Sequence, residues 1–223
     1  MRILALSDAE DRALWDHYEP SRLQDVELIL SCGDLPPEYL QFIVTMANCP
    51  LLYVRGNHDA RYDWDPPEGC MDIDGTVYNY RGLRILGLGG TMRYKNGSDM
   101  YTESEMKARI SRLWPKIALM NGFDILLSHA PAAGYGDMED LAHRGFECFN
   151  DLIMKWSPAY MLHGHVHKEY GGGFVRERRH AAGTRIINAY GKAYLDVKEH
   201  EHPPYGKTGS YMYDLYIALK GQF

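Results

Sequence analysis

Five short, unbroken apolar runs alternate with segments of helical character, and this alternation limits the fold more than any other feature of the sequence. The runs cover residues 3–6, 26–30, 51–54, 125–127 and 160–162. Such runs are typical of strands that are buried on both faces of a sheet. Between them, residues 36–46, 102–117 and 146–156 place apolar side chains at helical spacing. The pattern therefore predicts an α/β fold in which helices cover the sheets.

Local signals refine this prediction. Thr102 and Glu105 have the spacing of a capping box at the start of a helix, and Pro115 is expected to kink or divide that helix. Residues 76–88 predict a β-hairpin that turns at Arg81 and Gly82. Residues 184–196 contain further β-rich segments, and the tail after His200 shows no clear period.

Composition excludes several classes of protein. The 223 residues are 45% hydrophobic and 24% charged, as expected for one globular domain over residues 1–223. The net charge of -6 argues against a protein that neutralises duplex phosphates, and no insertion resembles a dedicated nucleic-acid-binding module. No apolar run approaches the ~20 residues that span a bilayer, so no membrane partner is expected. The four cysteines lack Cys-x-x-Cys spacing, which favours reduced thiols and a cytoplasmic protein.

Polar side chains follow each of the five runs, where each predicted strand ends. Since parallel strands bring their carboxyl ends to one edge of a sheet, these side chains should lie close together. Carboxylate, imidazole and amide oxygen suit a divalent metal such as Mn, Fe or Zn better than Ca. The candidates are too many for one ion, which favours two adjacent metal ions. They are Asp8, Glu10, Asp34, Asn57, His129, His165 and His167.

Each candidate taken alone also has a structural interpretation. Asp8 and Asp34 could be helix N-caps, Asn57 could be a turn residue, and His129 could be a hydrogen-bonded core histidine. His165 and His167 flank one residue, so both point the same way on an extended segment. That spacing favours shared metal binding.

The motifs resemble those of the calcineurin-like metallophosphoesterase superfamily over about residues 2–190. The matches are Asp8, Gly33-Asp34, Gly56-Asn57-His58-Asp59, His129 and Gly164-His165-Val166-His167, in the family's order. The resemblance implies a four-layer α/β/β/α sandwich of two mixed sheets. It also implies that a hydroxide held between two metal ions hydrolyses a phosphomonoester or phosphodiester, expected here to be a small molecule. Residues 197–223 form a tail of unclear role.

The resemblance also implies a role for each matched residue. The first metal ion would be held by Asp8, Asp34 and His167. The second would be held by Asn57, His129 and His165, with Asp34 bridging both. His58, paired with Asp59, would be the acid or orienting group near the leaving oxygen.

Three arginine features leave alternatives open. Arg55 either binds two phosphate oxygens through two parallel hydrogen bonds or pairs with a nearby carboxylate. Arg93 is a further candidate for substrate contact. The basic segment 176–180 is either a solvated surface or a site for a substrate's phosphate or an acidic partner.

Glu10 departs from the family pattern, which has His at this position. Glu10 could be a carboxylate ligand, could bind no metal, or could form a capping box with Ser7 for a helix that starts near Ala9. A third carboxylate makes the site less positive and favours harder ions, so Mn is expected, with Fe or Zn as alternatives. A second hypothesis for the whole chain is a non-catalytic metal-binding scaffold of the same fold that acts in protein interaction.

Overall fold

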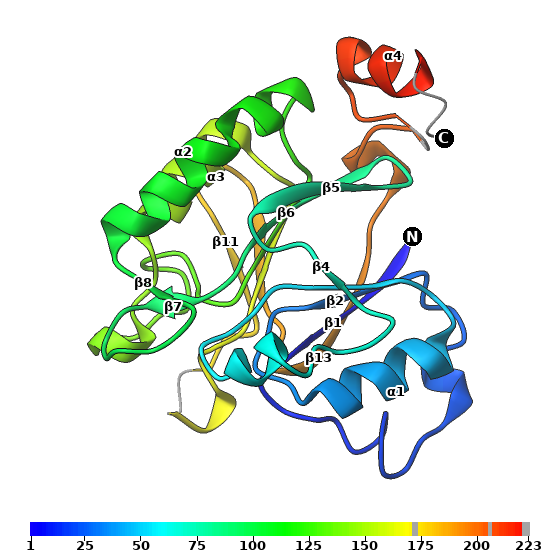
Figure 1. Cartoon of the computed structure of the whole chain (residues 1–223), viewed down its shortest axis with the longest axis vertical. Helices are drawn as coiled ribbons and strands as arrows, with labels where there is room; N and C mark the ends of the chain where they lie inside the picture. The colour runs from blue at the N-terminus through cyan, green and yellow to red at the C-terminus, as the bar shows by residue number, and fades with distance from the viewer. Residues whose placement is uncertain (171–173, 205–206, 220–223) are drawn as a thin grey trace.

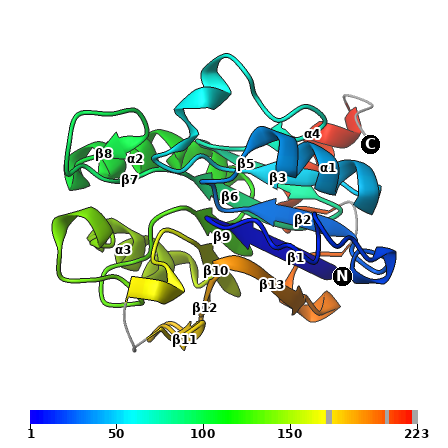
Figure 2. The same cartoon turned by 90° about the horizontal axis from the view of Figure 1, so that it is seen from below.

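The computed structural model of the chain describes residues 1–170, 174–204 and 207–219. Two β-sheets lie face to face at its centre. Helix α1 (Pro37–Ala47) covers the outer face of one sheet, while α2 (Glu103–Leu119) and α3 (Glu147–Trp156) cover the outer face of the other (Figures 1 and 2). The predicted four-layer α/β/β/α sandwich is confirmed.

The first sheet has five strands in the order β13-β1-β2-β3-β4. Strands β1 to β4 run parallel to one another, and β13 pairs antiparallel with β1. Three of the five predicted apolar runs form strands of this sheet. Its strands are β1 (Arg2–Ser7), β2 (Leu28–Ser31), β3 (Leu51–Tyr53), β4 (Met71–Asp72) and β13 (Gly191–Asp196).

The second sheet has six strands in the order β11-β12-β10-β9-β6-β5, and β7 pairs with β8 in a small ribbon. The predicted hairpin is confirmed as β5 and β6, and its turn residues Arg81 and Gly82 both have positive φ, as two-residue hairpin turns require. The strands are β5 (Thr76–Tyr80), β6 (Leu83–Leu88), β7 (Thr91–Met92), β8 (Met100–Tyr101), β9 (Ile125–Ser128), β10 (Tyr160–His163), β11 (Glu177–Arg179) and β12 (Arg185–Asn188).

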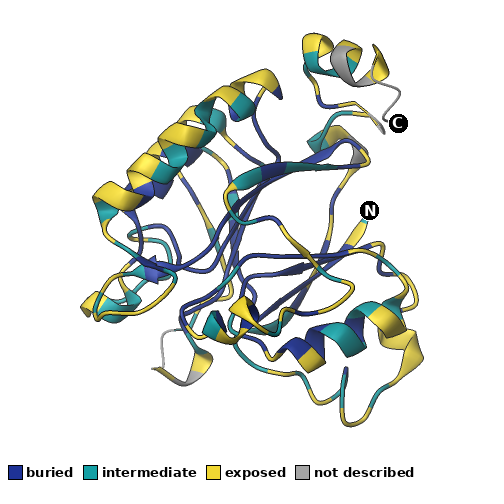
Figure 3. Cartoon of the chain, viewed as in Figure 1, coloured by how far each residue is buried: buried dark blue, intermediate teal, exposed yellow. Residues whose placement is uncertain are grey.

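Successive residues of the central strands pack into different layers, which explains why their apolar runs are unbroken. Leu30 of β2 lies between the two sheets, whereas its neighbour Ile29 packs beneath α1. On β9, Leu127 lies between the sheets and Leu126 packs beneath α2 and α3. Figure 3 shows the central strands as buried along almost their whole length.

Two helical features differ from the sequence predictions. The capping box of α2 is confirmed, but the helix runs unbroken through Pro115, because Met106 and Ile117 anchor it to the second sheet on both sides of the proline. Within the tail, residues Tyr211–Leu219 form helix α4, which the sequence pattern does not predict. Its apolar residues Tyr211 and Met212 are exposed, so apolar side chains do not mark one buried face of this helix.

In the part of the chain that the structure describes, five short 3-10 helices connect the larger elements. Within the described ranges, no helix is both long enough and apolar enough to cross a membrane. The short helices are η1 (Pro20–Arg22), η2 (Asp59–Asp63), η3 (Leu141–His143), η4 (Lys168–Tyr170) and η5 (Glu199–Glu201).

Candidate metal centre

The predicted ligands meet where β1 and β2 of the first sheet and β9 and β10 of the second sheet end. Three of them leave their strands in the left-handed region of backbone conformation. The φ angles are 64° at Asp8, 58° at Asp34 and 66° at His165. This conformation is uncommon for residues other than glycine, and strained backbone of this kind concentrates at functional sites.

Two motif glycines make room for these turns. A Cβ atom on Gly56 would overlap Asp34 Oδ1, and one on Gly164 would overlap Ser7 and the Asp8 carboxylate. Both glycines are therefore required by close packing against the carboxylates.

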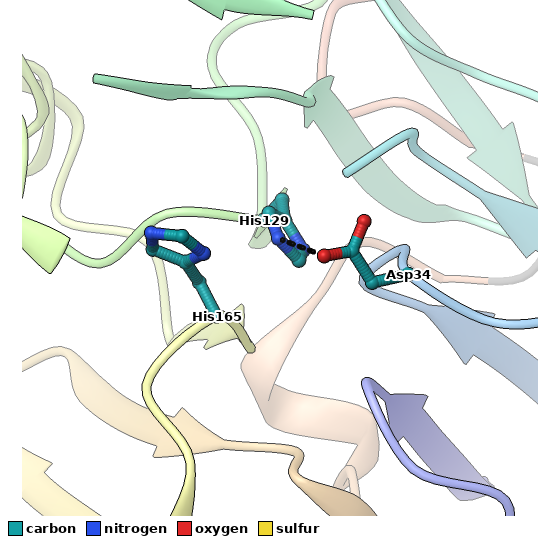
Figure 4. A group of neighbouring side chains, drawn as sticks. All are labelled: Asp34, His129 and His165. Atoms are coloured by element: carbon teal, nitrogen blue, oxygen red, sulfur yellow. Dashed lines mark ion pairs between the residues drawn. The ribbon is translucent and has the colours of Figure 1, made fainter. Parts of the chain in front are cut away.

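Asp34, His129 and His165 form the centre of the site (Figure 4). One ligand atom from each lies within 4.8 Å of the others, and His129 Nε2 is 3.2 Å from Asp34 Oδ2. A backbone carbonyl contacts the remaining nitrogen of each ring: Cys32 O lies 2.7 Å from His129 Nδ1, and Ala142 O lies 2.7 Å from His165 Nε2. Carbonyl partners of this kind fix the orientation of histidines that bind metals.

Asp8 and His167 form a second group beside the first. The Asp8 side chain is fully buried, and its Oδ1 atom lies 3.3 Å from His167 Nε2. The backbone N–H of His165 donates to both Asp8 oxygens, at 3.1 and 2.9 Å. Tyr170 stacks on the His167 ring with centroids 4.5 Å apart. The structure thus brings all six predicted ligands other than Glu10 to the facing ends of the sheets.

An unpaired buried oxygen indicates that the site fits a cation. Asn57 Oδ1 has no hydrogen-bond partner within the part of the chain that the structure describes, and His129 Nε2 faces the Asp34 carboxylate 3.2 Å away. An unpaired buried acceptor such as the Asn57 amide oxygen is costly, and a metal ion would satisfy it. The donor set of carboxylates, imidazoles and an amide oxygen suits a divalent transition-metal ion.

The charges of the site depend on one another. Burial opposes a charge on His129, but the carboxylates of Asp34, Asp8 and Asp59 together outweigh burial and raise the pKa of His129 to about 10. Burial also opposes a charge on Asp34, but the charge and hydrogen bonds of His129 and His58 together outweigh it and lower the pKa of Asp34 to about 2. Burial and the charge of His129 lower the pKa of His165 to about 3. Without metal, the protein therefore carries a buried imidazolium–carboxylate pair beside a neutral imidazole.

The residues after β3 surround the Asp34 carboxylate. His58 is exposed, and its backbone N–H donates to Asp34 Oδ1 at 2.8 Å. Asp59 is buried, and its Oδ2 accepts the backbone N–H groups of Asp34 and Gly56, both at 2.8 Å. The predicted pairing of Asp59 with the His58 ring is not among the described contacts, in which Asp59 binds these two backbone amides instead. Burial, followed by the charge of Asp34, raises the pKa of Asp59 to about 6.

Two of the arginines singled out in the sequence, Arg55 and Arg93, bind carboxylates. Arg55 Nη1 lies 2.5 Å from Asp63 Oδ1, and its Nε lies 3.6 Å from Asp72 Oδ2. Of the two interpretations of Arg55, the structure shows the carboxylate pairing. Arg93 pairs with Glu105 at 2.9 Å.

The structure also removes the helix-cap interpretations. Residues 9–19 form turns and irregular structure, so no helix begins near Ala9 for Glu10 to cap; Glu10 is exposed. The N-cap of α1 is Pro36 rather than Asp34. Glu10 therefore remains either a ligand or a residue without a metal.

Sequence reasoning missed several groups at the site. The Cys32 and Ala142 carbonyls carry no side-chain signal, so no sequence pattern could reveal their contacts with the histidines. Tyr94 Oη lies 3.5 Å from Asn57 Nδ2. The sequence signal for Tyr94 is its neighbour Arg93, a candidate for substrate contact. His143 Nδ1 lies 2.9 Å from Asp140 Oδ1, and the His143 ring lies beside His165 with centroids 5.1 Å apart.

Comparison with known proteins identifies the class of fold and site. Residues 1–195 match the calcineurin-like phosphoesterase superfamily domain, and the chain belongs to this family. It is 23% identical over 197 residues to UPF0046 protein K07C11.7 of Caenorhabditis elegans, covering 77% of this chain and 65% of the worm protein. The chain thus spans slightly less than two thirds of that relative. It is 25% identical over 185 residues to an uncharacterized protein of Haemophilus influenzae, covering 70% of this chain and 80% of the relative.

A solved structure agrees with the fold. TT1561 of Thermus thermophilus superposes with a TM-score of 0.59 at 18% sequence identity, covering 85% of this chain and 88% of the other. At this identity the likeness supports the shared architecture of two mixed sheets.

The first prediction concerns Asp34, which is expected to contact both metal ions. Asp34→Asn keeps the size of the side chain but removes its charge, so it should lower the metal content of the purified protein by at least one equivalent. Elemental analysis by mass spectrometry measures this, with Asp25→Asn as the exposed control. Unchanged stoichiometry in Asp34→Asn would refute a shared ligand.

The second prediction concerns the proton on His129. Because the pKa of His129 is raised to about 10, its ring should carry two protons near neutral pH after metal is removed with a chelator. Zinc loading should remove the Nε2 proton, since a metal ligand needs that lone pair. Long-range ¹H–¹⁵N NMR of the ring reports both states. His163 is the internal control, because burial lowers its pKa to about 4 and it should stay neutral throughout. A neutral His129 ring in the metal-free protein would contradict this.

Proposed function

We propose that the protein is a metal-dependent phosphoesterase that hydrolyses a small-molecule phosphomonoester or phosphodiester. The observation that carries this proposal is the meeting of the Asp34–His129–His165 cluster with the Asp8–His167 pair. We propose two divalent ions, with Mn expected before Fe or Zn. The free thiols of the four cysteines support a reducing compartment, and we propose a cytoplasmic location.

The proposed ligand sets follow the two groups of side chains. Asp8, Asp34 and His167 would hold one ion, and Asn57, His129 and His165 would hold the other. When bound, the ions would activate water and stabilise negative charge on the phosphoryl oxygens.

The chain's own groups have separate tasks in this proposal. Asp59 holds the Asp34 and Gly56 backbones in place through two hydrogen bonds, which fixes the turn that carries Asn57. His58 is tied to Asp34 through its backbone N–H, while its ring remains exposed beside the site. The ring can therefore reach a bound substrate and donate a proton to the leaving oxygen. Arg55 already binds two carboxylates, so it serves to fix the loop after β3.

A panel of phosphoesters tests the proposal. Purified protein loaded with Mn, Fe, Zn or Mg should hydrolyse at least one monoester or diester, and Asp34→Asn should not. The scaffold hypothesis makes the opposite prediction, namely retained metal without turnover on any substrate. The carboxylate pairs that occupy Arg55 are compatible with that alternative, because they leave fewer free cations for phosphate.

The third prediction separates the two roles open to His58. His58→Ala should keep its metal content and slow hydrolysis of an alkyl phosphate by ~10²–10⁴-fold, as expected when a general acid is lost. The loss should be much smaller for nitrophenyl phosphate, whose leaving group needs little protonation. Steady-state kinetics on both substrates measure the difference, with His200→Ala as the control. Equal losses on both substrates would instead make His58 a phosphate-positioning residue.

The fourth prediction concerns Glu10, which we propose as a ligand of the first ion because it lies two residues after Asp8. Glu10→Gln should weaken binding of one ion, whereas Glu10→His should retain two ions and shift preference toward Fe or Zn, which favour nitrogen ligands. Metal titration followed by elemental analysis measures both variants, with the exposed Glu68→Gln as the control. Full metal content and activity in Glu10→Gln would show that Glu10 binds no metal.

A further inference from the structure

A cavity of about 230 Å³ lies against the metal ligand His167 and is distinct from the pocket that contains His58. Its apolar wall includes Met138, Val166 and Val175, and its polar wall includes Arg178. The cavity therefore combines an apolar surface, one arginine and direct contact with the proposed metal centre.

Arg178 differs from the other charged residues of its segment. It is the middle residue of β11, where strand alternation leaves Glu177 and Arg179 exposed and turns Arg178 to the partly buried face. Glu177 pairs with Arg185, and Arg179 donates to the Gly183 carbonyl. This alternation places one arginine of the basic segment in the cavity wall and its neighbour at the surface.

Arg178 is half-buried, and the structure shows no hydrogen-bond or ion-pair partner for its guanidinium among the described residues. Among the residues that the structure describes, the buried Nε atom has no hydrogen-bond partner, and no carboxylate lies within ion-pair distance of the guanidinium. By contrast, Arg176 donates to the carbonyls of Asn188 and Tyr190. An unpaired guanidinium donor in a cavity is costly unless a ligand supplies the acceptor.

Two other polar side chains of the cavity, Asp137 and Asn188, are already satisfied. Both oxygens of Asp137 accept backbone N–H groups, from Gly134 and Gly145. Asn188 donates to the Val166 carbonyl and accepts from the Tyr190 N–H. A ligand in this cavity thus meets one strong unused donor, which selects for an oxyanion, because a guanidinium binds carboxylate and phosphate through two parallel hydrogen bonds.

We infer that this cavity binds the organic portion of the substrate, and that this portion carries an oxyanion, a carboxylate or a second phosphate, on an apolar frame. The inference rests on the proposed function, since it places the phosphoryl group of the same molecule at the metal centre beside His167. It narrows the substrates to phosphoesters with a second negative charge.

Binding of the organic portion alone tests the cavity without any turnover. The probes are 3-hydroxybenzoate for the carboxylate, 3-hydroxyphenylphosphonate, which has no ester bond to hydrolyse, for the phosphate, and neutral 3-hydroxybenzyl alcohol. Calorimetry on the metal-loaded protein should show that one anion binds ten- to hundredfold more tightly than the neutral probe, as expected for a charged hydrogen-bonded pair. The phosphonate probe could also bind the metal ions. Only the part of its affinity that Arg178→Met removes is therefore evidence for binding in the cavity.

The arginine variants locate the effect. Arg178→Met should abolish the preference for the anion, Arg178→Lys should keep part of it because the charge remains, and Arg179→Met should keep it fully. Circular dichroism verifies that each variant is folded. Equal preference in wild type and Arg178→Met, or an equal loss in Arg179→Met, overturns the inference.

Measurements of turnover then distinguish the inference about the cavity from the proposed phosphoesterase function. Wild type should hydrolyse 3-carboxyphenyl phosphate or 1,3-phenylene bisphosphate with a kcat/KM ten- to hundredfold above that for phenyl phosphate, and Arg178→Met should remove this advantage alone. Hydrolysis without any advantage for the anionic esters overturns the inference and leaves the phosphoesterase proposal intact. Arg178-dependent binding without hydrolysis of any ester overturns the proposed function and, with it, the assignment of the cavity to a substrate.

Discussion

The two sheets are joined at their polar edge by buried charged groups, and the candidate site depends on this junction. Asp34 follows β2 of the first sheet and lies against His129, which follows β9 of the second. Asp8 follows β1 and accepts the backbone N–H of His165, which follows β10. Buried charges are stable only when paired, so these contacts fix how the ends of the sheets face each other. The candidate metal centre is therefore formed by the same contacts that position the layers.

This junction also explains how the site can exist before it binds an ion. The raised pKa of His129 and the lowered pKa of Asp34 describe an ion pair between two of the predicted metal ligands. Carbonyls of Cys32 and Ala142 hold the rings in place, and left-handed turns hold Asp8, Asp34 and His165. A divalent ion held by these residues would displace the proton of His129 and would need no rebuilding of the strand ends. Such preorganisation lowers the cost of binding.

The sequence predicts the features that depend on local pattern. Buried strands such as β2 and β9 show as apolar runs because their two faces pack into different layers, and the motif residues after them mark the edge where the sheets meet. Features that depend on distant partners could not be predicted. The Asp63 and Asp72 partners of Arg55 come from η2 and from β4. The partners of Asp59 are backbone amides, and α2 continues through Pro115 because the second sheet supports it. The role of Glu10 depends on a bound ion, which local pattern does not determine.

The two pockets beside the candidate metal centre would place different demands on a substrate. His58 is tied to Asp34, whereas the cavity with Arg178 lies against His167, which contacts Asp8. A monoester has a single organic group, and if the cavity holds that group, the leaving oxygen would lie on the cavity side and His58 would act on the other phosphoryl oxygens. A diester has a second organic group that can extend toward His58 and leave from there. The role of His58 and the class of ester are thus linked: strong dependence on the leaving group at His58 favours a diester, and a uniform effect favours a monoester that His58 positions.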